Sequence, residues 1–158
     1  MRDFNFYGLR LGDPQANIEK CFSDWNWEYV EKFSDPKADI HVYCALTPEG
    51  QAAMLFFFKD QLYSVRLGYD PGRTSAIGGW TTILERLVGR FGKAHSESAG
   101  VFPINQEGQF AEYFWHFRQI AQSIMLRVYT DSTVVEFTDD NLELAALDKK
   151  KREANLGF

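Results

Sequence analysis

The chain has little cysteine and little histidine, and this scarcity limits the chemistry that it can support. Its 158 residues include two cysteines, Cys21 and Cys44, and three histidines, His41, His95 and His116. The cysteines form no Cys-x-x-Cys pair, and no further ligands stand at the spacing of a zinc site. We therefore predict no metal site and two reduced thiols that pack as small hydrophobic side chains, with a disulfide only if the fold brings them together.

The motifs of common enzymes are missing as well. The sequence contains no GxSxG, HExxH or GxGxxG pattern and no acidic calcium-binding loop. The three histidines fall in three different predicted elements, so none has a nucleophile and an orienting carboxylate close by in the sequence. These absences favour a non-enzymatic protein that uses no cofactor.

The sequence also lacks a recognisable leader peptide and a membrane span. Met1 is followed at once by Arg2 and Asp3, and no hydrophobic stretch reaches the length that crosses a bilayer. The formal net charge of −5 opposes attraction to a phosphate backbone. We predict a cytoplasmic protein that binds neither nucleic acid nor a membrane; removal of a leader would instead imply an envelope location.

Aromatic side chains, in contrast, are plentiful. Fourteen Phe, seven Tyr and four Trp make up 16% of the chain, more than a minimal core of this length needs. Most are expected in the core, and the surplus is expected on a surface that binds another protein. We expect Trp25, Trp27 and Tyr29 to form such a surface patch.

The hydrophobic pattern predicts one α+β domain over residues 1–158, with a mainly antiparallel sheet of seven or eight strands and helices packed on one face. Helices are expected at residues 14–22, 79–91 and 139–153. Strands are expected at residues 4–7, 25–33, 39–46, 52–58, 62–69, 110–118, 123–129 and 133–138. The helix at 79–91 is the clearest, because its apolar residues recur every three or four positions and Gly92 follows as a stop signal.

Residues 1–69 and 70–142 share an outline, which is a glycine-bearing entry, a helix and a meander of strands. This outline is compatible with an internal repeat, although the two segments show no clear residue-level identity. In the C-terminal helix, Leu142, Leu144, Ala145 and Leu147 are expected to pack against the domain.

Three short segments carry a resemblance to known domains. They are Phe-Tyr-Gly-Leu-Arg-Leu-Gly-Asp at residues 6–13, Leu-Tyr-Ser-Val-Arg-Leu at residues 62–67 and Leu-Val-Gly-Arg-Phe-Gly-Lys at residues 87–93. Together they resemble the helix-plus-meander pattern of the BamE (SmpA/OmlA) lipoproteins and of β-lactamase-inhibitor-protein-like modules. The chain departs from the lipoprotein pattern because it has no signal peptide and no lipobox cysteine. The resemblance implies a protein-binding role and no catalytic chemistry.

Three arginines on predicted strands, Arg66, Arg118 and Arg127, are the most suggestive polar residues. If their strands are neighbours, the guanidinium groups would line one sheet face and bind carboxylates of a partner or ligand. The alternative is cross-strand ion pairing with Glu112 or Glu136.

A second candidate site is the loop predicted at residues 70–79. It follows a strand and precedes a helix, where backbone N–H groups attract anions, so Arg73, Thr74 and Ser75 are candidate anion-binding residues. The Gly-Lys-Ser/Thr ending of a phosphate-binding loop is missing, and a flexible connection is the alternative.

Taken together, these features predict a non-enzymatic protein-binding module of the inhibitor, immunity or assembly-accessory type. Its partner would be a basic protein, because an acidic chain encounters a positive surface faster. The alternative is a small-ligand-binding protein or an enzyme with a pocket between the sheet and the helix that begins at Trp80. The pattern defines no oligomeric state.

Overall fold

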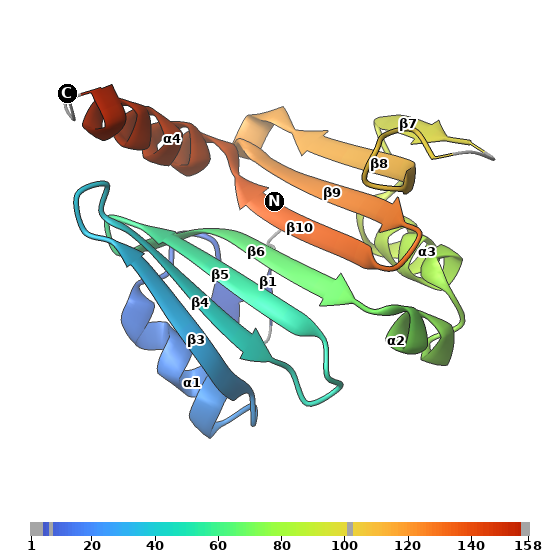
Figure 1. The fold of residues 1–158 in the computed structure, drawn as a ribbon, viewed down its shortest axis with the longest axis horizontal. Coiled ribbons are helices and arrows are strands. Elements are labelled where there is room, and N and C mark those ends of the chain that lie inside the picture. The colour runs from blue at the N-terminus through green and yellow to red at the C-terminus, as the bar shows by residue number, and fades with distance from the viewer. Residues whose placement is uncertain (1–4, 7, 101–102, 156–158) are drawn as a thin grey trace.

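Eight antiparallel strands form one sheet in the computed structural model, which describes residues 5–6, 8–100 and 103–155 (Figure 1). The order across the sheet is β3-β4-β5-β6-β10-β9-β8-β7. The strands are β3 (Glu28–Asp35), β4 (Ile40–Leu46), β5 (Ala52–Phe58), β6 (Gln61–Tyr69), β7 (Ser96–Ala99), β8 (Gln109–Phe117), β9 (Gln122–Tyr129) and β10 (Thr133–Asp139). The predicted α+β class with a mainly antiparallel sheet is confirmed.

Two runs of consecutive strands make up this sheet. Strands β3 to β6 pair in chain order, and β7 to β10 do the same, so each run is a meander joined by short turns. The runs meet where β6 pairs with β10, from Tyr69 opposite Thr133 to Ser64 opposite Thr138. This central pairing joins segments about half the chain apart and leaves β3 and β7 as the two outer strands.

Helix α3 (Trp80–Phe91) covers the β7–β10 side of the sheet, as its periodicity predicts. Its residues Ile83, Leu87 and Phe91 are buried against strands β8, β9 and β10. Gly92 ends the helix with φ +86° and ψ −178°, a conformation that a residue with a side chain rarely adopts. The indole nitrogen of the fully buried Trp115 donates to the Gly92 carbonyl at 2.8 Å, which ties the helix end to the sheet.

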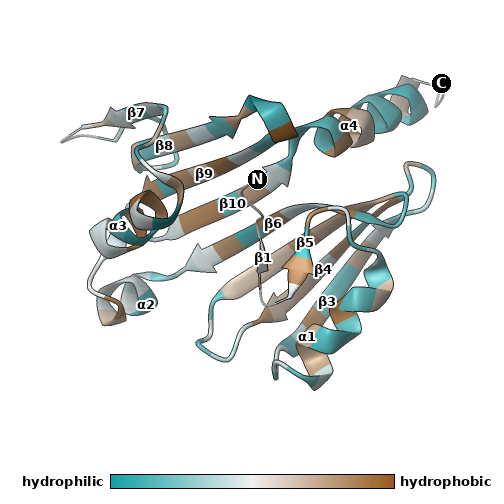
Figure 2. Ribbon diagram, turned by 180° about the vertical axis from the view of Figure 1, so that it is seen from behind, coloured by the Kyte–Doolittle hydropathy of each residue, from teal (hydrophilic) through white to brown (hydrophobic). Residues whose placement is uncertain are grey.

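The half of the sheet formed by β3 to β6 is covered, on the same face as α3, by a short helical segment made of η1 (Gln15–Ile18) and α1 (Glu19–Ser23). Ile18 and Cys21 are buried there with apolar residues of β4, β5 and β6. Trp27 joins the same cluster and is only 3% exposed, so the expectation that it lies in a surface patch is wrong. Figure 2 shows α1 and α3 in front of the same face of the sheet.

Helix α4 (Asp140–Asn155) does not belong to this layer, contrary to the expectation that all helices pack on one face. It continues from the end of β10 and lies beyond the strand ends (Figure 1). Asp139 caps it by accepting a hydrogen bond from the Leu142 N–H at 3.0 Å. The predicted packing is wrong for Leu144, Ala145 and Leu147, which are exposed, whereas Leu142 is partly buried and Ala146 is buried.

Helix α2 and strands β7 and β2 were not expected from the sequence pattern, whereas β1 lies within the strand predicted at residues 4–7. Residues predicted as a loop form helix α2 (Pro71–Ala76), and an outer strand, β7, lies in the polar segment before β8. Near the N-terminus, β1 (Asn5–Phe6) pairs with β2 (Leu9–Arg10); positions 4 and 7 of the strand predicted there lie outside the described residues. No helix in the described part of the chain is long and apolar enough to span a membrane.

Candidate functional site

One face of the sheet carries no α1 or α3, and its side chains form rows across the strands. The pairing register places six side chains in the central row, each partly exposed: Cys44, Met54, Arg66, Glu136, Met125 and Phe114. The residues next to them along each strand, such as Leu67 and Leu126, point to the opposite face and are buried under α1 and α3. We call this surface the helix-free face, although the start of α4 reaches one end of it.

Two of the three arginines selected from the sequence lie on the helix-free face. Arg66 Nε is 2.8 Å from Glu136 Oε2 on the neighbouring strand, and Arg127 Nε is 3.6 Å from Glu112 Oε2. The predicted alternative of cross-strand ion pairing is therefore confirmed for both. The guanidinium of Arg66 also lies over the Phe56 ring, 5.2 Å from its centroid.

Arg118 is separated from this pair. It belongs to η2 (Arg118–Ile120), a single turn that follows β8, and not to a strand as predicted. The chain reverses direction there through Ala121, which has a left-handed backbone. The structure therefore brings Arg66 and Arg127 to one face and leaves Arg118 at the end of the β8–β9 hairpin.

Acidic groups gather where α4 begins. Burial, together with the nearby Glu136 and Asp140 carboxylates, raises the pKa of Glu143. Burial, followed by the charge of Glu143, raises the pKa of Tyr63 to about 12. Because Arg66 is already paired with Glu136, this end of the helix-free face retains an excess of negative charge.

The most exposed apolar residues of the sheet lie on its outer strand β3. Tyr29, Val30 and Phe33 are 54%, 53% and 52% exposed, and Trp25 just before the strand is 43% exposed. Within the described residues β4 is the only strand paired with β3, so the outer backbone edge of β3 faces outward. Proteins normally protect such an edge by shortness, charge or a covering segment. We refer to Tyr29, Val30 and Phe33 with this backbone edge as the β3 edge.

Sequence reasoning found only part of the β3 edge. It selected Tyr29 and Trp25, which are exposed, together with Trp27, which is buried. It missed Val30 and Phe33, because a strand's hydrophobic residues do not reveal whether the strand lies inside a sheet or at its border. A β-bulge between Tyr29 and Glu31 further breaks the simple alternation of faces.

The candidate anion-binding residues lie on α2, where the protein's own carboxylate caps the helix. Asp70 Oδ1 accepts a hydrogen bond from the Arg73 N–H at 2.8 Å, and the Arg73 guanidinium contacts the Glu49 carbonyl oxygen. Thr74 Oγ1 donates to the Asp70 carbonyl at 2.8 Å, while Ser75 is exposed. The Arg73 N–H and guanidinium and the Thr74 hydroxyl, which were candidates to hold an anion, thus already have partners within the chain.

Neither cysteine is part of a disulfide, and both thiols are free. Burial raises the pKa of Cys21 to about 11, which suppresses the reactive thiolate. Burial, with a smaller effect of Glu31, also raises the pKa of Cys44. No group of three or more His, Cys, Asp or Glu residues in the described part of the chain is arranged to hold a metal ion.

Comparison of the chain with models of known families, with curated proteins and with solved structures gives no match. The functional argument therefore depends on the geometry and chemistry of this chain.

Proposed function

We propose that this protein is a non-enzymatic protein-binding module and that its β3 edge receives an extended segment of the partner. The observation that carries the proposal is the exposure of Tyr29, Val30 and Phe33, each more than half exposed on an eight-residue outer strand. Such an edge pairs readily with another strand, because its outward N–H and C=O groups form a template for a β-ladder.

The other border of the sheet supports this assignment by contrast. Strand β7 has four residues, Ser96 to Ala99, and contains no large hydrophobic side chain. Short, polar outer strands are the usual way to discourage edge pairing. The two borders of one sheet are therefore built differently, and only β3 combines length with apolar side chains.

An added strand would gain stability from two sources. Backbone hydrogen bonds along β3 contribute about 0.5–1.5 kcal/mol each after exchange with water. Covering the exposed parts of Tyr29, Val30 and Phe33 adds roughly 1 kcal/mol per side chain, about half the value for complete burial. Strand β3 also carries Glu28, Glu31 and Asp35 against a single lysine, Lys32, so an incoming segment with basic side chains beside apolar ones would match it best.

The module would be of the inhibitor, immunity or assembly-accessory type expected from the sequence, and its partner would be a basic protein. The net charge of −5 favours encounter with a basic surface. The acidic excess near Glu143 acts in the same direction. A reducing compartment, as in the cytoplasm, is part of the proposal and agrees with the two free thiols.

The alternative was a ligand pocket between the sheet and the helix that begins at Trp80. A cavity of about 150 Å³ does lie there, lined mainly by apolar residues that include Leu67, Leu87 and Phe137. Ligand sites usually measure about 300–1,000 Å³ and contain several convergent polar groups. The lining also includes Tyr69, Arg86 and Arg90, but the volume lies below this range, which favours the protein-binding role.

We extend the proposal to the chain's organisation as two similar halves. The β3–β6 run and the β7–β10 run each follow a helical segment, and they meet through their last strands, β6 and β10. This arrangement is what a duplicated helix-plus-meander unit would give. In such a duplication β3 and β7 are equivalent strands, of which only β3 kept a binding edge.

A pair of matched variants tests the proposed function. The Val30→Lys/Phe33→Lys variant places two charges on the β3 edge, and the Ser96→Lys/Ser98→Lys variant places two on β7. We expect both to keep their thermal midpoint within a few degrees, because all four side chains are exposed. A partner identified with the wild-type protein in its host should be lost by the β3 variant and kept by the β7 variant. Equal binding by both variants would contradict the proposal, and sedimentation of the purified chain would show whether the partner is a second copy.

A further inference from the structure

Strand β5 is apolar on both of its faces, although α1 covers only one of them. It reads Ala-Ala-Met-Leu-Phe-Phe-Phe from Ala52 to Phe58, without a polar side chain. An antiparallel strand with one face in water normally alternates apolar and polar residues, whereas a continuous apolar run is typical of a strand covered on both faces. The run therefore indicates an additional contact surface on the helix-free side of β5.

Strand β4 extends this apolar surface. The pairing register sets Val42 opposite Phe56, and Cys44 opposite Met54, so their side chains are neighbours on the helix-free face. All four are partly exposed, and none carries a charge. We name the partly exposed apolar residues of these two strands the β4–β5 patch: Val42, Cys44, Leu46, Met54 and Phe56. Contiguous apolar patches of this kind mark interaction surfaces.

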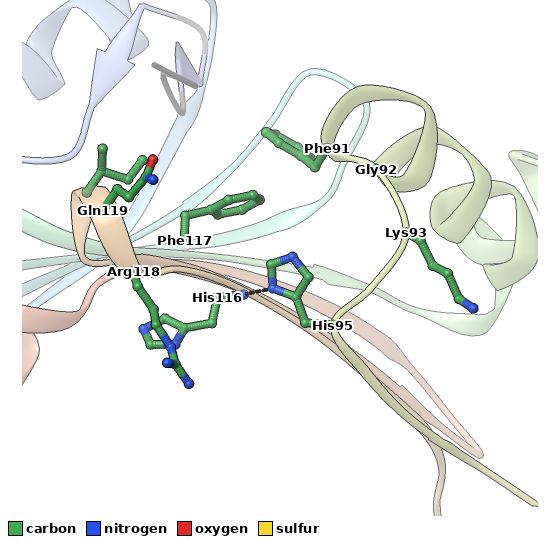
Figure 3. A pocket seen from close by; sticks show the side chains of 9 residues that line it. Phe91, Gly92, Lys93, His95, His116, Phe117, Arg118 and Gln119 are labelled. Atoms are coloured by element: carbon green, nitrogen blue, oxygen red, sulfur yellow. Dashed lines mark hydrogen bonds between the residues drawn. The ribbon is translucent and has the colours of Figure 1, made fainter.

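The same face becomes polar toward its other end. In the row that begins with Val42 and Phe56, the side chains on the following strands are Ser64, Thr138, Ser123 and His116. His116 Nε2 lies 3.2 Å from Asp140 Oδ2, and Figure 3 shows His116 and Arg118 extending on the same side of β8. In this row the apolar part is thus confined to β4 and β5.

The central row of the face has a carboxylate at one end of the patch and a guanidinium at the other. Glu31 on β3 lies opposite Cys44. Met54, the next side chain of the row, lies opposite Arg66 on β6. Glu31 is exposed, and the Arg66 side chain is still 42% exposed although it pairs with Glu136. Each end of the row therefore keeps a charged group that a second molecule can reach.

From this pattern we propose that the β4–β5 patch is the interface of a homodimer in which two helix-free faces stack. A two-fold axis that runs between β4 and β5, parallel to the strands, sets each patch on the patch of the second copy. It also exchanges the two ends of the central row, so that Glu31 of each copy lies over Arg66 of the other. An axis perpendicular to the strands would set Glu31 over Glu31. The charges thus favour a second copy as the occupant and define its orientation.

The dimensions of stacked sheets agree with this arrangement. Two sheets that pack face to face lie about 10 Å apart, with their strands within about 30° of each other. Side chains from both sheets fill this space, and extended glutamate and arginine side chains can meet across it. A basic protein partner, in contrast, has no electrostatic reason to prefer an uncharged patch. Stacking leaves the backbone edge of β3 unpaired, so the dimer is independent of the proposed partner strand.

Sedimentation of the purified chain and alkylation of Cys44 by iodoacetamide test the proposal together. The chain should form dimers with a dissociation constant below about 100 µM. Cys44 should react at least about fivefold more slowly in the dimer than in the diluted monomer, because its thiol lies within the patch, whereas Cys21 is buried in both. A chain that stays monomeric at about 1 mM would overturn the proposal. A dimer in which Cys44 reacts as fast as in the monomer would also overturn it and would indicate another interface.

Two matched variants locate the interface. Met54→Lys should weaken the dimer by about tenfold or more, because it buries an unpaired charge in the patch. Leu147→Lys adds the same charge at an exposed apolar position of α4 and should change the dissociation constant less than about twofold. Equal weakening by the two variants would show that overall charge controls association and that the patch is not the interface.

A double-mutant cycle tests the contact between Glu31 and Arg66 of the second copy. Glu31→Lys should weaken the dimer by about tenfold or more, but by less than about threefold when Arg66 is replaced by glutamine. Glu85→Lys makes the same charge change at an exposed position of α3 and should have less than about a twofold effect. An effect of Glu31→Lys that is equal in both backgrounds would exclude the proposed orientation.

Discussion

Replacement of Leu87 by alanine should destabilise the domain strongly, because this side chain joins α3 to the sheet. Leu87 is 8% exposed and packs in the cluster formed by α3 and strands β8 to β10. Removing three buried carbon groups costs about 2.4 kcal/mol at ~0.8 kcal/mol each. Leu87 also borders the cavity of about 150 Å³ beneath α3, so its loss enlarges a void that the neighbours already leave open. This adds about 1–2 kcal/mol at ~24 cal/mol per Å³.

The expected total is about 3.4–4.4 kcal/mol, which lowers the thermal midpoint by roughly 7–18 °C in a domain of this size. Urea denaturation followed by tryptophan fluorescence measures it well, since Trp80 and Trp115 lie in the same cluster. Val88→Ala is the control: Val88 is the next residue of the helix but is exposed, and its loss should cost less than about 1 kcal/mol. A Leu87→Ala midpoint equal to that of Val88→Ala would refute the packing argument.

Other consequences concern the glycines of α3, Glu143 of α4 and the thiols. Gly89→Ala, in open space within α3, should stabilise the fold by about 0.5–1 kcal/mol. Gly92→Ala, at φ +86°, should destabilise it by about 1–3 kcal/mol. Denaturant midpoints of the two variants that move in the same direction would contradict this expectation. Glu143→Gln should raise the thermal midpoint at pH 7, because the raised pKa of Glu143 means that its ionisation opposes folding. That gain should vanish near about pH 4, where the acid is protonated in both states, and a gain independent of pH would exclude this cause. Thiol titration should find two reactive groups in the unfolded chain and slow reaction of Cys21 in the folded one.

The strands and α3 could be predicted because each repeats a local pattern. A continuous run of seven apolar residues located β5 at its observed bounds, and the three-to-four spacing located α3 to within one residue. Helix α2 was missed although Asp70 and Pro71 are an N-cap followed by a first-turn proline. Asp13 and Pro14 form the same pair before η1, but there Asp13 Oδ2 accepts a hydrogen bond from the Arg10 N–H, and no side chain caps η1. An Asp-Pro pair thus predicts a change of chain direction, but it does not predict which backbone N–H group the aspartate will accept a hydrogen bond from.

Long-range pairing was the part that local patterns could not supply. The ion pair between Arg66 and Glu136 joins residues 70 positions apart, and it forms only because β6 and β10 meet at the centre of the sheet. Because β6 and β10 pair at the centre, β3 becomes an outer strand of the sheet, and Phe33 on it is exposed. In α4, the spacing of Leu144 and Leu147 correctly marks a helix, but spacing alone does not say whether another element covers them.

Hydrogen exchange of the β3 backbone, with and without the bound partner, tests the central claim most directly. If a partner strand pairs with the β3 edge, the outward amides of residues 28–35 should exchange about tenfold or more slowly in the complex. The amides of β7, at the other border of the same sheet, should exchange at an unchanged rate. A stable complex in which the β3 amides exchange as fast as in the isolated protein would contradict the proposed binding edge.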